Sequence, residues 1–228
     1  MPSNGARTVG SVALVALLLV VAAASTPAAA RAPPQPACDV CGERLTATAA
    51  EHGVDVAVGH AAVTVQVYEN ASTRWTARVE LTDGADALRN DTVRGAVIED
   101  VVGYRVDRFA VSSRMDGETL VVTYLRRDAA VRSAGAVVFT AFHASSPPPL
   151  AMGGEGTVYP GADELVVHAP DGYVVAGGIG DGNATQSAVR WAGENGGDDG
   201  IDRDTAVTFV PDGAVAPGLR GVVARLLR

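Results

Sequence analysis

The stretch Val63-Thr-Val-Gln-Val-Tyr-Glu-Asn-Ala-Ser-Thr-Arg-Trp-Thr-Ala-Arg-Val-Glu-Leu81 decides the fold, because it holds the clearest two-residue alternation in the chain. Val63, Val65 and Val67 fall on one face of its first half. From Trp75 onward every second residue is again apolar, and a short polar segment that favours a turn lies between the halves. The stretch therefore predicts a β-hairpin with one apolar and one solvated face, which is typical of an antiparallel sheet covered on one side.

Outward from this hairpin, the chain alternates between helical and strand patterns. Valines at every fourth residue through 93–101 predict a helix, and a second hairpin is expected over 105–126 around an Asp-Gly turn. The segment 128–142 predicts a further helix, although its apolar, β-branched end leaves a strand open. Short strands are expected at 164–168, 173–176, 188–191 and 205–210.

These patterns predict an α+β fold in which two β-hairpins joined by a helix form an antiparallel sheet, with further short strands and a C-terminal helix. A β-sandwich with helical insertions is the alternative. The C-terminal helix begins at Pro217 and carries an apolar stripe. We expect this stripe to pack onto the sheet, and a helix lying on a membrane surface is the alternative. The stripe consists of Leu219, Val222, Val223, Leu226 and Leu227.

The N-terminal segment, residues 1–30, has the pattern of a signal peptide. Arg7 precedes an apolar run of about 14 residues, which is shorter than the ~20 needed to span a bilayer. Ala28 and Ala30 form a small-residue cleavage site at the end of the segment. An uncleaved N-terminal anchor is the alternative, and both interpretations place the rest of the chain outside the cell, at the surface or secreted.

The remaining sequence divides by composition into a tether and one domain. Residues 31–42 are rich in proline and alanine at their start and are predicted to form a tether that carries a CxxC motif. Residues 43–228 are predicted to form a single extracytoplasmic α+β domain. Within it, the proline- and glycine-rich segment near 145–156 predicts a flexible loop.

Three of the five asparagines stand in glycosylation sequons, at Asn70, Asn90 and Asn183. This excess over chance supports export and predicts three candidate glycosylation sites. The alternative is a local hydrogen-bonding role, because asparagine beside serine or threonine is also common in turns and helix caps.

The only two cysteines, Cys38 and Cys41, allow three interpretations. The leading one is a local disulfide, which is expected when two cysteines share an oxidising compartment. The second is a metal site completed by His52 and His60, although their spacing is not that of a zinc finger. The third is a thiol–disulfide oxidoreductase, although no thioredoxin-like pattern surrounds the motif.

The net charge and the absence of known catalytic motifs narrow the possible classes of function. The formal net charge is −8, and all 18 basic residues are arginine. Such an acidic surface argues against a nucleic-acid partner, which requires clustered positive charge. No nucleophile elbow, phosphate loop or dinucleotide fingerprint occurs, and no cofactor is implied. The sequence therefore predicts a non-catalytic exported domain, with an envelope protein or the membrane surface as its contact, and a CxxC-based redox or metal-binding protein as the alternative.

The CxxC motif near the expected mature N-terminus, the hairpin quoted above and the segment Asp163–Tyr173 together resemble uncharacterised secreted or membrane-anchored ectodomains of haloarchaea. The resemblance covers most of residues 38–212. It implies an extracellular location and brings no activity, cofactor or catalytic residue.

Overall fold

The computed structural model describes residues 35–103, 108–143, 158–192, 201 and 205–227. The signal peptide predicted at 1–30, the first residues of the tether and the flexible loop predicted at 145–156 lie outside these ranges. Among the described residues, no helix combines the length and the hydropathy of a membrane span.

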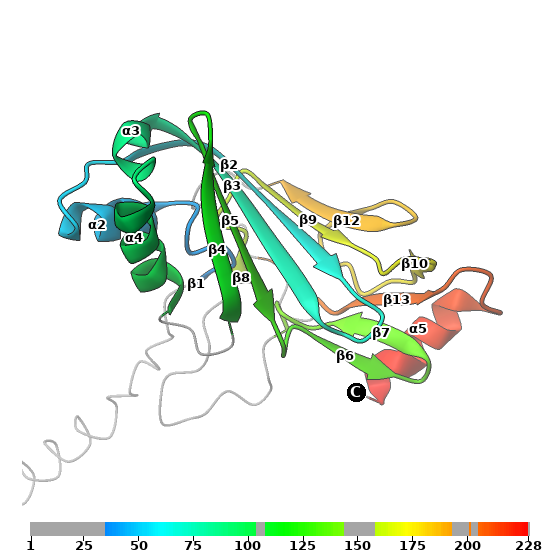
Figure 1. The fold of residues 1–228 in the computed structure, drawn as a ribbon. Helices are drawn as coiled ribbons and strands as arrows, with labels where there is room; N and C mark the ends of the chain where they lie inside the picture. The colour runs from blue at the N-terminus through cyan, green and yellow to red at the C-terminus, as the bar shows by residue number, and fades with distance from the viewer. Residues whose placement is uncertain (1–34, 104–107, 144–157, 193–200, 202–204, 228) are drawn as a thin grey trace, which may run out of the picture.

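A seven-stranded sheet forms the body of the molecule and confirms the predicted α+β fold (Figure 1). Its strand order is β11-β12-β9-β2-β3-β5-β4. The two predicted hairpins lie side by side in it, and only β9 runs parallel to its neighbour, β2. The strands are β2 (Ala57–Val67), β3 (Thr73–Asp83), β4 (Arg108–Asp116), β5 (Thr119–Arg126), β9 (Glu164–His168), β11 (Asn183–Ala184) and β12 (Ala188–Ala192).

The alternation in the sequence fixes which side chains enter the core. Val65 lies opposite Trp75, and Val63 lies opposite Ala77, so the apolar residues of β2 and β3 share one buried face. Residues between them, such as Thr64, point to the solvated face. A shift of one residue would exchange the two faces, so burial determines the register of this hairpin.

Three helices cover one end of this sheet: α2 (Glu43–Glu51), α3 (Ala85–Leu88) and α4 (Asp91–Gly103). The last two connect the hairpins, as predicted. Asn90 begins α4, because its Oδ1 accepts hydrogen bonds from the backbone N–H groups of Thr92 and Val93 at 3.0 and 3.3 Å. Val97 and Val101 are buried on the inner side of this helix.

A second, four-stranded antiparallel sheet covers the other end, with the order β10-β13-β7-β6 (Figure 1). Its strands are β6 (Ala130–Ser133), β7 (Ala136–Phe139), β10 (Tyr173–Val175) and β13 (Val207–Pro211). The helix predicted over 128–142 is therefore wrong. Ala134 and Gly135 have positive φ angles of 49° and 74°, so the chain reverses in a tight turn and forms a hairpin there.

Strand β7 is uninterruptedly apolar because both of its faces are buried. Val137 and Phe139 point into the core shared with the seven-stranded sheet, whereas Ala136 and Val138 point to the opposite side. A strand buried on both faces shows no alternation, which is why its sequence also suited a helix.

A cluster of five mutually contacting aromatic rings lies in the core between the two sheets. Trp75 stacks on Tyr124 with ring centroids 6.1 Å apart, and Phe142 joins Phe139 and Trp191 at 5.1 and 5.6 Å. The indole N–H of Trp75 donates to Thr73 Oγ1 at 3.0 Å. The two sheets and helices α2 and α4 therefore share one continuous core.

The part of the predicted tether that the structure describes, residues 35–42, is packed against the domain. Strand β1 (Gln35–Pro36) pairs in parallel with β8 (Val158–Tyr159), and the residues from Ala37 to Cys41 are buried. Gly161 allows this approach, since a Cβ there would lie 2.5 Å from that of Pro36. The Cys-Asp-Val-Cys segment thus belongs to the core and not to a linker.

The C-terminal helix α5 (Pro217–Leu226) exists as predicted but presents the opposite face to the sheet. Its buried residues are Gly221 and Ala224, and the stripe predicted to pack on the sheet is exposed. The reason is space, because a Cβ on Gly221 would lie 2.8 Å from the carbonyl oxygen of Ala176. Only the face of α5 that carries small side chains can lie this close to the backbone of Ala176.

Candidate functional site: the buried cysteine pair

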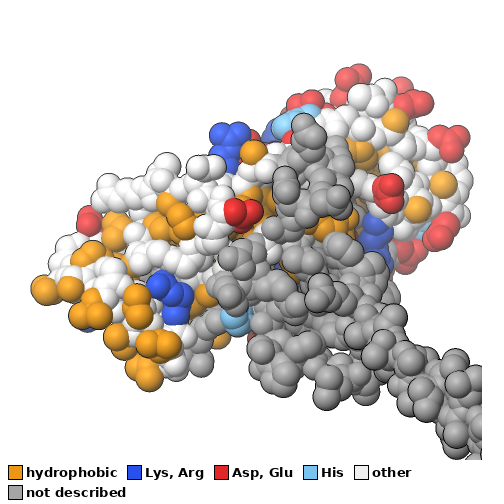
Figure 2. Space-filling model, turned by 180° about the vertical axis from the view of Figure 1, so that it is seen from behind, with side chains coloured by type: hydrophobic (Ala, Val, Ile, Leu, Met, Phe, Trp, Pro, Cys, Tyr) orange, Lys and Arg blue, Asp and Glu red, His pale blue; other side chains and the backbone are white. Residues whose placement is uncertain are grey.

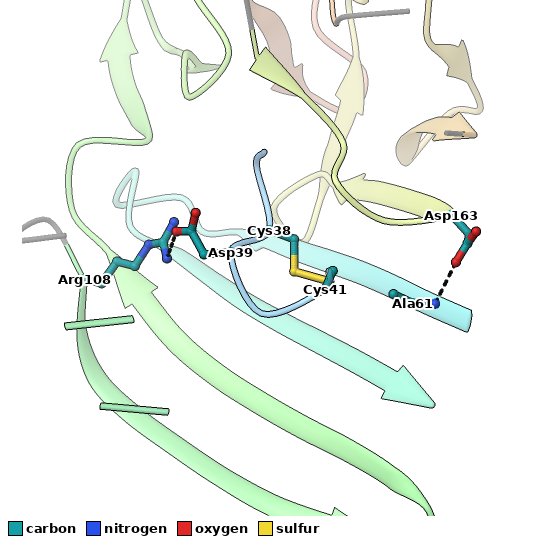
Figure 3. The surroundings of a disulfide bond; sticks show 6 residues. All are labelled: Cys38, Asp39, Cys41, Ala61, Arg108 and Asp163. Carbon is teal, nitrogen blue, oxygen red and sulfur yellow. Dashed lines mark hydrogen bonds and ion pairs between the residues drawn. A yellow bond between two sulfur atoms is a disulfide. The ribbon is translucent and has the colours of Figure 1, made fainter. Parts of the chain in front are cut away.

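The two cysteines lie in the loop between β1 and α2 (Figure 3). Their sulfur atoms are 2.02 Å apart, which is disulfide distance. Cys38 is 2% exposed and Cys41 is not exposed at all. Val40 and Leu45 are buried around them in the same apolar core. The pair is therefore sealed beneath the surface.

Asp39, inside the CxxC motif, forms a buried ion pair. Its Oδ2 lies 2.5 Å from Nη1 of Arg108 in β4, and both side chains are almost completely buried (Figure 3). The guanidinium of Arg108 also lies over the Tyr124 ring, 4.8 Å from its centroid. This contact fixes the cysteine loop to the edge strand of the seven-stranded sheet.

Sequence reasoning did not find this pair. The signal that could have indicated it is the position of Asp39, a carboxylate inside an apolar Cys-Asp-Val-Cys segment, because a buried charge requires a partner. The sequence could not identify Arg108 as that partner, since the chain has 18 arginines.

Tyr159 borders the same region on β8. Burial raises the pKa of this phenol above its usual value of 10.0, and the negative charges of Glu43 and Asp39 raise it further. The phenol therefore stays protonated at neutral pH.

The geometry of the cysteine pair disfavours thiol chemistry in the folded state. Thiol–disulfide exchange requires a thiolate to reach a sulfur atom along the S–S direction, and both sulfur atoms are enclosed by core residues. The pair can close the loop between β1 and α2, but a partner protein cannot reach it without local opening.

The two histidines proposed as metal ligands lie in different places and have their own partners. His52 Nε2 contacts Asp100 Oδ2 at 2.7 Å, linking the end of α2 to α4. His60 Nδ1 lies 3.3 Å from Asp163 Oδ2, which also accepts a hydrogen bond from the backbone N–H of Ala61 (Figure 3). Among the described residues, no group of three or more His, Cys, Asp or Glu side chains could hold a metal ion.

All three sequon asparagines are exposed. Asn70 lies in the β2–β3 turn, where its Oδ1 accepts hydrogen bonds from the backbone N–H and hydroxyl of Ser72 at 3.0 and 2.7 Å. Asn90 begins α4, and Asn183 lies on the edge strand β11. The turn and cap roles use Oδ1 of Asn70 and Asn90, whereas a glycan attaches to the amide nitrogen, so the local and glycosylation interpretations are compatible.

A shallow pocket near the helical end is lined by arginines, but their charges are matched. Arg94 is buried and donates to Asp91 Oδ1 at 2.6 Å and to the Leu88 carbonyl at 2.9 Å. Arg89 is paired with Asp86, and Arg114 Nη1 lies 3.4 Å from Asp116. These carboxylates disfavour binding of an anionic ligand in the pocket.

A scan against protein-family models, a search of curated proteins and a search of solved structures gave no match to this chain.

Proposed function

We propose that this protein is a non-catalytic module that is exported and works at the cell surface or secreted, in association with the envelope. The observation that carries the proposal is the cysteine pair, which lies at disulfide distance inside the core. Structural disulfides form and persist in oxidising compartments, outside the reducing cytoplasm. A sealed pair suits a structural role better than a redox cycle.

Four further features support export. Residues 1–30 have the composition of a signal peptide, and all three sequon asparagines are accessible to a modifying enzyme. The acidic composition and the resemblance to haloarchaeal ectodomains also suit a protein that works in a salty exterior, where repulsion among carboxylates is screened. The signal-peptide pattern, the sequons and the acidic composition are independent of the cysteine pair, whereas the resemblance rests in part on the CxxC motif.

The first test is thiol accessibility in the exported protein. The folded protein is incubated with dithiothreitol in molar salt, followed by a maleimide reagent of high mass, and modification is read as a gel shift. We expect no modification of the folded protein and two additions in urea with reductant, because the core seals both sulfur atoms. The urea sample is the control for reactivity.

Fast reduction and reoxidation of the folded protein would overturn the structural role and favour the redox alternative. Stoichiometric zinc in the purified protein, measured by elemental analysis, would favour the metal alternative. Mass spectrometry of the protein from fractionated cells tests export separately, with an N-terminus at Arg31 expected outside the cytoplasm. Retention of residues 1–30 on a cytoplasmic protein would contradict export.

A further inference from the structure

Helix α5 exposes its large apolar side chains and buries its small ones. Leu219 and Leu226 are 67% and 77% exposed. Figure 2 shows hydrophobic side chains gathered at the end of the molecule where α5 lies. We call this surface the α5 face. It consists of Val215, Leu219, Val222, Val223, Leu226 and Leu227.

The orientation of α5 is fixed by specific contacts. Gly221 approaches the backbone of Ala176, and Ala224 is fully buried in a small cluster beneath the helix. Arg225 Nη1 donates to Thr208 Oγ1 at 3.1 Å, and its guanidinium lies against Gly177. Rotating the helix to bury the leucines would break all of these contacts. The contacts therefore hold the α5 face toward the solvent.

The charge around the α5 face contrasts with the acidic character of the chain. Every charged residue in the four-stranded sheet and α5 that the structure describes is an arginine, namely Arg132, Arg220 and Arg225. Arg132 is paired with Val137 and therefore points to the face of the sheet opposite α5, so Arg220 and Arg225 are the arginines that flank the stripe. The nearest described carboxylates along the chain are Asp128, Asp171 and Asp212, in the exposed turns that flank β6, β10 and β13. Helices α2, α3 and α4 at the other end carry six carboxylates against two arginines.

From this combination we infer that α5 docks on an anionic membrane surface, with its axis in the membrane plane. An apolar stripe flanked by arginine is the pattern of an interfacial helix, whose side chains enter the headgroup and upper acyl region. The helix has ten residues and spans about 15 Å, so it cannot cross a hydrocarbon core of about 30 Å. Lipid phosphates would supply the negative charge that the α5 face lacks.

A second copy of the chain fits this surface less well. A two-fold contact through α5 would bring Arg220 of both copies into one apolar interface, and the helix carries no carboxylate to pair with them. The inference deepens the proposed function by naming its partner. It rests on the proposed function only in placing the protein on the outer side of the cell membrane. Binding of the purified protein to vesicles does not depend on the compartment in which the protein works.

The test places a reporter on the α5 face. Leu226→Trp introduces an exposed indole, whereas the native Trp75 and Trp191 are buried and give a constant background. Vesicles of phosphatidylglycerol, with matched vesicles of phosphatidylcholine, are added to the full chain in molar salt and again at 0.1 M salt. We expect a blue shift of the emission with phosphatidylglycerol, together with quenching by brominated acyl chains, because the indole enters the interface.

Two sets of variants in the Leu226→Trp background separate the apolar and charged contributions. Leu219→Ser with Leu227→Ser should weaken vesicle binding at least tenfold while leaving the melting temperature unchanged, since both side chains are exposed. Arg220→Glu should weaken binding to phosphatidylglycerol about fivefold or more at 0.1 M salt. Arg78→Glu, on the solvated face of the seven-stranded sheet, is the matched charge control and should change little.

Three outcomes would overturn the inference. Emission that does not respond to either vesicle would exclude membrane docking. Emission that is already blue-shifted without vesicles would assign the α5 face to a second copy if sedimentation shows a dimer, or to another segment of this chain if it shows a monomer. Equal shifts with both lipids would refute the anionic partner. None of these outcomes bears on export, which is tested by fractionation.

Discussion

At the scale of single residues, the ion pair between Asp39 and Arg108 connects the cysteine loop to the sheet. Both groups have left water, so their mutual attraction has to offset a large desolvation cost. Removing one partner is more harmful than removing both, because the remaining charge stays buried without its counterpart. The pair therefore acts mainly on the position of the loop.

Asp39→Ala should lower the free energy of unfolding by about 3 kcal/mol, because it leaves the Arg108 guanidinium buried without its carboxylate. The double variant Asp39→Ala with Arg108→Met should recover part of this loss, since the methionine is apolar and of similar length. Urea denaturation in molar salt measures both values. Equal stability of Asp39→Ala and the unchanged protein would show that the ion pair contributes nothing.

The sequence predicted only part of this site. The proximity of Cys38 and Cys41 is expected for two cysteines separated by two residues, but their burial could not be read from the sequence. Proline-rich residues before the motif indicated a tether, whereas the pairing of β1 with β8 draws the segment inward. That pairing joins positions more than 120 residues apart, and no local pattern encodes it.

At the scale of elements, the periodicity of the sequence predicted which helices and strands exist better than it predicted which of their faces is buried. The hairpin of β2 and β3 was predicted correctly, because one solvated face makes the alternation visible. Strand β7 was predicted only as the alternative to the end of a helix, because burial on both faces removes the alternation. Helix α5 was located correctly, but a stripe of large apolar residues does not say whether a core or another partner covers it.

The contact of α5 with the sheet can be tested with one substitution at two positions of the helix. Gly221→Ala should destabilise the protein by about 1–3 kcal/mol, because the new methyl group meets the backbone oxygen of Ala176 at 2.8 Å and forces the helix outward. Gly218→Ala has open space around it and should stabilise by up to about 1 kcal/mol through helix propensity.

Thermal melts of the two alanine variants, compared with the unchanged protein, give the sign of each effect. A gain in stability at both positions would mean that α5 is not held at the observed distance. A loss at both would point to a requirement for chain flexibility that the packing does not explain.

At the scale of the whole molecule, one core joins the two sheets with helices α2 and α4, and a smaller cluster lies beneath α5. Trp75 and Trp191 belong to the same aromatic cluster, which also contains rings from β5, β7 and the segment after β7. Separate cores would allow the four-stranded sheet to unfold on its own. A shared core makes each sheet depend on the other.

We therefore expect a single cooperative unfolding transition. Tryptophan fluorescence, which reports the aromatic cluster, and far-ultraviolet circular dichroism, which reports all strands and helices, should give the same urea midpoint. A first transition that loses strand signal while the tryptophans remain buried would show that the four-stranded sheet is an independent unit.

The uneven distribution of charge along the molecule has a kinetic consequence. Carboxylates gather at the end of the molecule that holds α2, α3 and α4 (Figure 2), while the charged residues within the described strands of the far sheet and within α5 are all arginines. The charges of the described residues therefore form an electric dipole along the length of the molecule, and the field of a charged surface exerts a torque on such a dipole. Beyond a Debye length of about 10 Å in 0.1 M salt this torque is screened. Inside that distance, an anionic surface turns the molecule so that α5 arrives first, although the net charge of −8 opposes the approach.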